Sequence, residues 1–419
     1  MHAGQGRAAL RADESWSVIV GSNPRRRAIV AFCFICLGLA LHGTAWAQLR
    51  ELQDLAAASL GADQGVFVQA EDGTVLIAQQ DSRPVHPASV TKLATSLALL
   101  EQLGHDHRFE TRFLAGGAVL DGSLEGDLVV QATGDPSFVF ENAFLMLREL
   151  HAQGLRRVRG DLRLTGPLLF NWKADATGRR LKRALQGLDG AEAWAAIGGS
   201  ATELKKDALQ FAAGEARQAP GKVLVENRSP SLIAIVKALN GYSNNVFHLL
   251  SDRIGGSGQV EAIVRRHLSP ELRPEVVITN AAGAGESNRL SPRAAVAILW
   301  ELRKELRAHG KDLPSALPVN GFDAGTLKHR LSEDRYRGRI VGKTGTFGSV
   351  GASALAGVLH TARYGDVAFA VLDSWVPVPE ARHRQDMFLR ALIDATDAKP
   401  WDYVPDEKPI FAGATIDAR

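Results

Sequence analysis

Three short motifs in the sequence combine side chains that could carry out acyl transfer. They are Ser89-Val90-Thr91-Lys92, Ser243-Asn244-Asn245 and Lys343-Thr344-Gly345, and each occurs once. A serine hydroxyl becomes a nucleophile when a nearby base removes its proton, and a lysine can be that base. Any one motif alone would be weak evidence. Together, in this order, they predict a hydrolase that forms an acyl-enzyme on Ser89.

The spacing of Ser89 and Lys92 suits this chemistry. Residues three apart on a helix lie on the same face, so the hydroxyl and the amine can meet. Lysine acts as a base only when neutral, which requires its pKa of about 10.4 to fall through burial or a nearby positive charge. We expect Lys343 to supply that charge. Without the other motifs, an exposed lysine beside an unrelated serine would be the better interpretation.

The second motif is expected to assist at the leaving group. Ser243 stands just before a predicted helix, where a serine is often only an N-cap. Next to a serine–lysine pair, Ser243 would instead relay a proton between Lys92 and the leaving amine. Asn245 would hydrogen-bond the substrate amide.

The third motif, with the threonine after it, is expected to bind the substrate backbone and its C-terminal carboxylate. We expect Lys343-Thr344-Gly345-Thr346 to follow a short strand. Gly345 would let a substrate strand approach the sheet edge, and the lysine and threonine would bind the carboxylate. Backbone N–H groups of Ser89 and Thr346 would form the oxyanion hole. A plain strand-to-turn junction is the alternative.

Hydrophobic spacing predicts the elements that must position these residues. Helices are expected at 49–60 and from near Pro87 or Ala88 to about Gly104. Other expected elements are a hairpin at 65–78, helices at 231–239, near 244 and at 292–309, strands at 339–343, 353–360 and 367–372, and a helix at 379–395. Strands joined by short turns pair antiparallel. We therefore predict an α+β fold with an antiparallel sheet flanked by the first and last helices.

The region between the first two motifs is predicted to form a smaller inserted α/β domain. Strands are expected at 108–114, 124–132 and 158–165, with a helix at 140–153. From about 170 to 220 the chain is rich in Ala, Gly, Lys and Arg and has few large apolar residues. No element is predicted there, and we interpret that segment as a mobile excursion.

The N-terminus has the features of an export signal. Arg25, Arg26 and Arg27 precede an apolar run, and Ala45-Trp46-Ala47 fits a cleavage site. The run is shorter than the roughly 20 residues that a spanning helix needs. We therefore predict a cleavable signal peptide over 1–47, a periplasmic protein and no stable membrane anchor. An uncleaved anchor is the alternative.

Removing this leader changes the cysteine content and the net charge. Both cysteines, Cys33 and Cys36, lie in the leader, so the mature chain is predicted to have no disulfide. The leader carries five of the 49 Lys and Arg and two of the 46 Asp and Glu, which leaves 44 of each. A formally neutral chain does not favour a nucleic-acid partner.

Other catalytic signatures are absent or incomplete. Gly104-His105-Asp106-His107 resembles part of a metal site, but no third ligand is recognisable, so no metal is predicted. No cofactor is implied. The sequence has no G-x-S-x-G nucleophile elbow and no H-E-x-x-H motif.

The three motifs and their surroundings resemble the D-alanyl-D-alanine carboxypeptidase/endopeptidase family of penicillin-binding proteins, which is peptidase S13-like and has an insertion between its first two motifs. Further matches are Pro87-Ala88-Ser89, Gly126-Asp127-Leu128, Gly134-Asp135-Pro136, Ser229-Pro230, Asn288-Arg289-Leu290-Ser291-Pro292, Gly325-Thr326-Leu327 and Gln385-Asp386. The resemblance implies a β-lactamase/transpeptidase-like catalytic domain at 48–108 and 223–399, an inserted domain at 109–222 and a C-terminal tail at 400–419.

The resemblance also implies a penicillin-sensitive serine D-Ala-D-Ala carboxypeptidase or endopeptidase. Its partners would be peptidoglycan peptides ending in D-Ala-D-Ala, with β-lactams as inhibitors. The catalytic residues would be Ser89, Lys92 and Ser243. The residues that bind the substrate would be Asn245, Lys343, Thr344, Gly345 and Thr346. A β-lactamase, a broader esterase and a non-catalytic peptidoglycan-binding scaffold are the alternatives. No motif identifies a dedicated glutamate for the deacylation that a β-lactamase needs.

Two features depart from the family pattern. Asn280-Ala281-Ala282-Gly283 stands where family members usually carry Asp-Gly-Ser-Gly, so a carboxylate and a hydroxyl are lost and rate or substrate preference is expected to differ. The insertion is also shorter than in the larger family members.

Overall fold

Two hydrophobic cores organise the chain. The computed structural model describes residues 50–212, 221–242 and 245–419. From Leu52 onwards, one core lies around the main sheet and its neighbouring helices, and a smaller one lies in the region inserted after the first motif. The predicted signal peptide over 1–47 lies outside the described residues. Within them, no helix combines the length and the hydropathy needed to cross a bilayer.

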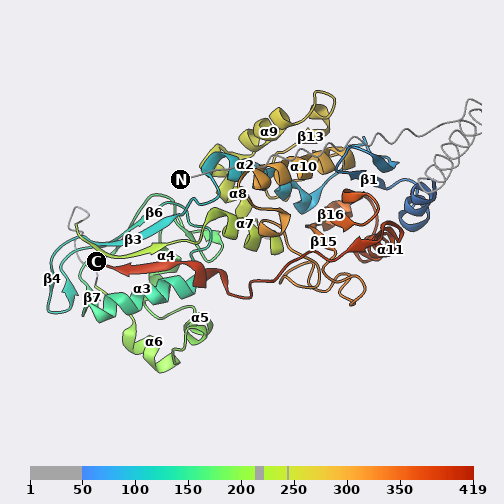
Figure 1. Cartoon of the computed structure of the whole chain (residues 1–419). Coiled ribbons are helices and arrows are strands. Elements are labelled where there is room, and N and C mark those ends of the chain that lie inside the picture. Colours follow the sequence, from blue (N-terminus) through green and yellow to red (C-terminus); the bar gives the residue numbers. More distant parts are fainter. Residues whose placement is uncertain (1–49, 213–220, 243–244) are drawn as a thin grey trace, which may run out of the picture. The chain divides into compact units, whose positions relative to one another are not determined.

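The main sheet contains the third motif. Its strands are β1 (Gly65–Ala70), β2 (Val75–Gln79), β15 (Ile340–Phe347), β16 (Ala352–Thr361), β17 (Gly365–Asp373) and the short β18 (Ala398–Lys399). They pair antiparallel in the order β15-β16-β17-β1-β2, with β18 against β16. Strands from 65–79 and from 340–399 thus share one sheet, and β15 forms an edge (Figure 1).

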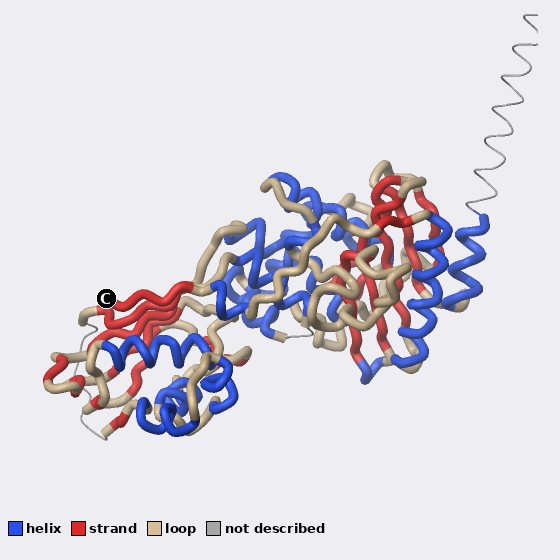
Figure 2. The backbone as a smooth tube through the Cα atoms, turned by 60° about the horizontal axis from the view of Figure 1, so that its bottom comes forward, coloured by secondary structure: helices blue, strands red, loops and turns tan. Residues whose placement is uncertain are grey.

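Helices cover both faces of this sheet (Figure 2). The bounds are η1 (Ala88–Thr91), α2 (Lys92–Leu103), α7 (Leu232–Gly241), α8 (Val246–Ser251), α9 (Gly256–His267), α10 (Pro292–Ala308) and α11 (Val378–Thr396). Helix α10 packs against α2 and the sheet, and α11 packs against β16. All but one residue of β16 are buried, because helices lie on both of its faces. The predicted sheet flanked by helices is confirmed.

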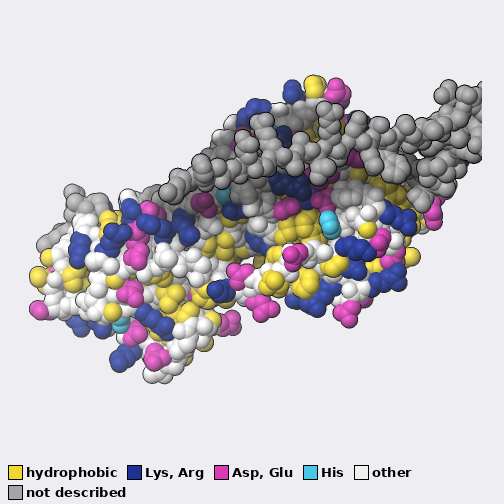
Figure 3. Space-filling view, in the orientation of Figure 1, with side chains coloured by type: hydrophobic (Ala, Val, Ile, Leu, Met, Phe, Trp, Pro, Cys, Tyr) yellow, Lys and Arg dark blue, Asp and Glu magenta, His cyan; other side chains and the backbone are white. Residues whose placement is uncertain are grey.

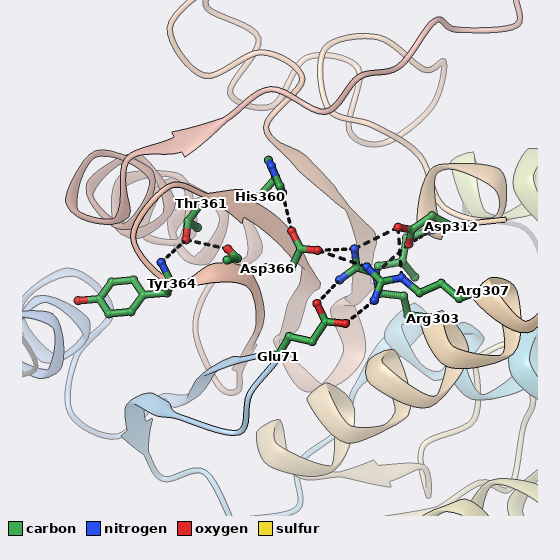
Figure 4. Close-up of polar contacts among 10 residues, drawn as sticks. Glu71, Arg303, Arg307, Asp312, His360, Thr361, Tyr364 and Asp366 are labelled. Atoms are coloured by element: carbon green, nitrogen blue, oxygen red, sulfur yellow. Dashed lines mark hydrogen bonds and ion pairs between the residues drawn. The ribbon is translucent and has the colours of Figure 1, made fainter. Parts of the chain in front are cut away.

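A charged network ties α10 to the end of the main sheet (Figure 4). Arg303 is only 3% exposed, and its guanidinium donates to Asp312, with Nε–Oδ1 at 2.8 Å, and to Asp366 of β17. Glu71, in the turn after β1, contacts both Arg303 and Arg307. A buried charge needs such partners because leaving it unpaired away from water is costly. The network therefore holds the helix that covers the sheet.

The inserted region has a sheet of its own. Its strands are β3 (Glu110–Ala115), β6 (Leu128–Ala132), β8 (Leu162–Thr165), β12 (Val223–Arg228) and β19 (Thr415–Ala418), in the order β19-β12-β3-β6-β8. Only the β6–β8 pair is parallel. Helix α3 (Phe140–Ala152) packs against β12 and β19. This arrangement confirms an α+β fold with a smaller inserted α/β unit.

The described chain also contains several short strands. They are β4 (Val119–Leu120), β5 (Ser123–Leu124), β7 (Arg157–Val158), β9 (Leu169–Phe170), β10 (Lys173–Ala174), β11 (Gln210–Phe211), β13 (Val276–Val277) and β14 (Arg289–Leu290). The order β11-β7-β5-β4 makes a second small sheet in the inserted region.

The prediction that residues 170–220 carry no regular elements was wrong for their described part. That part contains the helices α4 (Arg179–Leu185), α5 (Ala191–Ala196) and α6 (Ala201–Asp207). They place Leu181, Trp194 and Leu204 in the smaller core. Helices of six or seven residues, with one to three buried side chains each, show too little periodicity to be recognised from sequence.

Two strands of the inserted sheet fall outside the limits expected for that domain. Strand β12 was expected in the catalytic domain and β19 in the tail, yet they pair with each other from Val225–Ala418 to Arg228–Thr415. Strand β12 also pairs with β3. We propose that the inserted domain includes both strands, so that the end of the chain returns to it.

Candidate active site

Ser89 lies in the turn η1, which runs directly into α2. Ala88, just before it, has φ +46°, a conformation that is uncommon for a residue with a Cβ and is typical of strained functional turns. The Ala88 N–H donates to His86 Nδ1 over 3.1 Å, which helps to hold this turn. Ser89, 6% exposed, is thereby fixed at the start of a buried helix.

Lys92 is the partner of Ser89. Its side chain is fully buried, Nζ lies 2.7 Å from Ser89 Oγ, and Nζ donates to the Ala282 carbonyl oxygen over 2.6 Å. Burial, and then the positive charge of Lys343, lower the pKa of Lys92 from 10.5 to about 6. A neutral amine has hydrogens for the Ala282 oxygen and a lone pair for the serine proton. The arrangement fits a general base already unprotonated near pH 7.

The Asn280–Gly283 loop, where the sequence departs from the family pattern, lies against this pair. The group of Ala282 that accepts a hydrogen bond from Lys92 is its backbone carbonyl, not its side chain. The changed sequence of this loop therefore still supplies an acceptor for the Lys92 amine. Gly283 has φ +75°, and a Cβ there would lie 1.9 Å from the Ala88 carbonyl oxygen. Asn288 holds the loop, because its Oδ1 accepts the Asn280 N–H over 2.9 Å. Sequence reasoning missed these roles, although it had singled out both segments.

The third motif lies inside β15, so the expectation that it follows a short strand was wrong. Lys343 is fully buried, its Nζ donates to the Thr344 carbonyl oxygen over 2.8 Å, and burial lowers its pKa to about 7. Gly345 lies against the nucleophile turn. A Cβ there would be 2.8 Å from the Pro87 oxygen and 3.0 Å from the Ser89 nitrogen. A glycine is needed for this close approach.

The outer edge of β15 is the one that faces away from β16. Gly342 donates outward to the Pro318 carbonyl over 3.1 Å, and strand alternation points the N–H groups of Thr344 and Thr346 the same way. Beyond the Val319–Val341 bridge, no other strand of the described chain pairs with this edge. Strand β15 also contacts η1, the turn that carries Ser89.

Two neighbours of the third motif were not predicted as site residues. Thr326 Oγ1 lies 2.6 Å from Thr344 Oγ1, which gives the Gly325-Thr326-Leu327 segment a place beside the motif. Arg382 of α11 donates to Thr346 Oγ1 over 2.9 Å. Nothing in the spacing of Arg382 indicates this contact, because it comes from the closing helix.

The second motif is described only in part. Ser243 and Asn244 lie outside the described residues. Asn245 is exposed at the start of α8, and Phe247 of the same helix has its ring centroid 5.9 Å from Lys92 Nζ. The helix that carries the end of the motif therefore borders the base. The roles of Ser243 and Asn245 stay predictions.

Comparisons with known proteins found relatives in sequence and in structure. The D-alanyl-D-alanine carboxypeptidase DacB of Haemophilus influenzae is 38% identical over 75 residues, and a D-alanyl-D-alanine carboxypeptidase of Actinomadura sp. is 37% identical over 130. These stretches are 18% and 29% of this chain and only 16% and 24% of those relatives. A penicillin G-acylated predatory endopeptidase of Bdellovibrio bacteriovorus is 20% identical, with a TM-score of 0.64 over 84% of this chain and 99% of its own.

That structural likeness shows a shared fold and confirms the predicted fold class. Residues 48–170 and 203–392 match the model of a single family, and these two segments include all three motifs. Since the match spans well over half of the sequence, the chain belongs to the D-Ala-D-Ala carboxypeptidase 3 (S13) family.

Proposed function

We propose that the chain is a penicillin-sensitive serine D-Ala-D-Ala carboxypeptidase and endopeptidase acting on peptidoglycan peptides. The observation that carries this proposal is the buried Lys92 amine, 2.7 Å from Ser89 Oγ and with a pKa of about 6. A lysine without a catalytic task is rarely buried, because burial penalises its charge. Here that penalty yields a base matched to neutral pH.

In the proposed acylation, Ser89 Oγ attacks the carbonyl carbon of the penultimate D-alanine while its proton passes to Lys92 Nζ. The developing oxyanion accepts hydrogen bonds from the N–H groups of Ser89 and Thr346. The C–N bond then breaks, and the amine leaves with a proton that Ser243 relays from Lys92. Water hydrolyses the resulting ester and frees the serine.

Substrate binding is proposed to use the outer edge of β15, where no other strand of the described chain pairs beside the third motif. An extended peptide would pair with the outward N–H and C=O groups of Thr344 and Thr346. Its C-terminal carboxylate would meet the Thr344 hydroxyl and the positive charge of Lys343. Asn245, at the start of α8, would bind the substrate amide.

In this proposal the protein is exported to the periplasm, its signal peptide is cleaved after Ala47, and β-lactams are acylating inhibitors. We propose no nucleic-acid partner and no stable membrane anchor. In Figure 3, Lys and Arg side chains are interspersed with Asp and Glu over the visible face rather than gathered into one basic patch. Such mixing fits a formally neutral mature chain and gives no support to phosphate-backbone binding.

The test is release of D-alanine from a synthetic peptide ending in D-Ala-D-Ala, together with cleavage of D-alanyl cross-links in purified peptidoglycan fragments. We expect wild-type protein to release D-alanine, and Ser89→Ala to release none. Absence of both activities in folded wild type would contradict the proposal and favour a peptidoglycan-binding scaffold. Rapid turnover of penicillin without peptide cleavage would favour a β-lactamase.

A further inference from the structure

Three potential metal ligands meet at the end of α2 that lies away from Ser89. His105 is in the turn just after α2, and Glu305 and His309 lie one turn apart on α10 and at its C-cap. Side chains four apart on a helix face the same way. Packing of α10 against α2 brings His105 to them across 200 residues of sequence. One donor atom from each residue lies within 4.8 Å of the others.

The distances within this cluster suit a tetrahedral ion. His105 Nε2 lies 3.3 Å from Glu305 Oε1, and His309 Nδ1 lies 3.3 Å from the same oxygen. Zinc bonds to nitrogen and oxygen are about 2.0–2.1 Å long, so two ligands of a tetrahedral zinc ion are separated by about 3.3 Å. Both donor-atom separations in the cluster match this ligand–ligand distance. Since the donor atoms of all three residues lie within 4.8 Å of one another, an ion could bridge them after the His309 side chain rotates.

The surroundings leave one side of the cluster open. His105 is 3% exposed, whereas half of the His309 side chain is exposed. The two imidazole rings stack at 4.1 Å, so ion binding requires the exposed His309 ring to turn out of the stack. A water molecule can then occupy the fourth position.

We propose that His105, Glu305 and His309 form a binding site for a divalent transition-metal ion, Zn²⁺ foremost, that fastens the end of α2 to α10. Two imidazoles and one carboxylate favour zinc over Mg²⁺ and Ca²⁺, which prefer oxygen ligands. The role is structural, because Ser89 lies in η1 beyond the far end of α2, whose 12 residues span roughly 18 Å at 1.5 Å per residue. The site is independent of the chemistry at Ser89.

The experiment is titration of ZnCl₂ into mature, tag-free protein freed of metal by chelator, followed by calorimetry and by thermal unfolding. We expect one zinc ion per chain and a higher melting temperature with zinc than without it. The variants His309→Ala and Glu305→Gln should each weaken zinc binding at least about 10-fold and abolish the thermal shift. MgCl₂ should cause no shift.

His383→Ala serves as the matched control, because it removes another exposed helical histidine, on α11, away from the cluster. Circular dichroism establishes that each variant is folded. His309 is half exposed, so its removal leaves the core intact. Zinc binding that is absent in wild type, or equally strong in folded His309→Ala, would overturn the proposal and leave the cluster as a pair of histidine–carboxylate ion pairs.

Discussion

Replacing Lys343 by methionine should shift the pH dependence of Ser89 acylation. In the wild type, burial and then the Lys343 charge lower the pKa of Lys92 to about 6, and burial lowers the pKa of Lys343 itself to about 7. Only neutral Lys92 can accept the serine proton, so the rate should rise with pH through about 6. Only charged Lys343 attracts a carboxylate, so the rate should fall again as pH passes about 7.

The size of the effect follows from the fraction of neutral amine. At pH 7 a lysine with a pKa of 6 is about 90% neutral, whereas one with a pKa of 10.5 is about 0.03% neutral, a ratio of roughly 3,000. In Lys343→Met the second cause of the Lys92 shift is gone and burial, the larger cause, remains. The rising limb should therefore move above pH 6 but stay well below 10.5, and the falling limb should disappear.

The assay is the second-order rate constant for acylation by a fluorescent penicillin, measured by stopped flow from about pH 4 to about pH 9. Lys304→Met, which removes an exposed lysine of α10, is the control and should keep the wild-type profile. A rising limb that stays near pH 6 in Lys343→Met, or a falling limb that persists, would refute the assigned charges.

Three further substitutions test other parts of the account. Lys92→Met should slow acylation at least about 1,000-fold, yet it should raise the free energy of unfolding at pH 7 by up to about 5 kcal/mol in urea titrations. The reason is that Lys92 binds fewer protons in the native state than in the unfolded state between pH 6 and 10.5. The wild type should therefore become more stable as the pH rises over that range, and the variant should lose this dependence. Gly345→Ala should cut penicillin acylation about 100-fold with an unchanged circular dichroism spectrum, since its Cβ would collide with the turn that holds Ser89; full activity would contradict the close approach. Asp366→Asn should lower the free energy of unfolding by about 3 kcal/mol in thermal melts, because Arg303 loses a buried partner, while Ser89 still reacts. An unchanged melting curve would show that the network adds nothing to stability.

The sequence was most informative where the chemistry is local. The approach of Ser89 to Lys92 follows from their spacing of three residues, and the lowered Lys92 pKa was expected from burial and from Lys343. The hairpins of the main sheet were also predictable, because short turns between apolar runs fix antiparallel pairing. The roles of these residues in catalysis remain proposals.

Other parts of the site depend on atoms that no residue type identifies. The acceptor of the Lys92 amine is the backbone carbonyl of Ala282, and backbone carbonyls are present at every position. The strained φ of Ala88 is equally invisible in its side chain. Sequence reasoning treated the Asn280–Gly283 departure as a loss of polar side chains, whereas the fold uses the backbone there.

Contacts between distant segments account for the remaining misses. Strand β19 joins the inserted sheet through pairing with β12, nearly 200 residues earlier, and its four residues carry no recognisable strand signal. Likewise, the two side chains that meet His105, those of Glu305 and His309, come from α10 and cannot be found from the sequence around His105. Such pairings are set by tertiary packing rather than by local pattern.

The most direct test of the central claim is the intact mass of the mature protein after incubation with penicillin, followed by peptide mapping of the modified residue. The account predicts one penicilloyl group per chain on Ser89, stable for many minutes, and none on folded Ser89→Ala. An unmodified wild-type protein, or a penicilloyl group on any residue other than Ser89, would contradict the proposed acyl-enzyme.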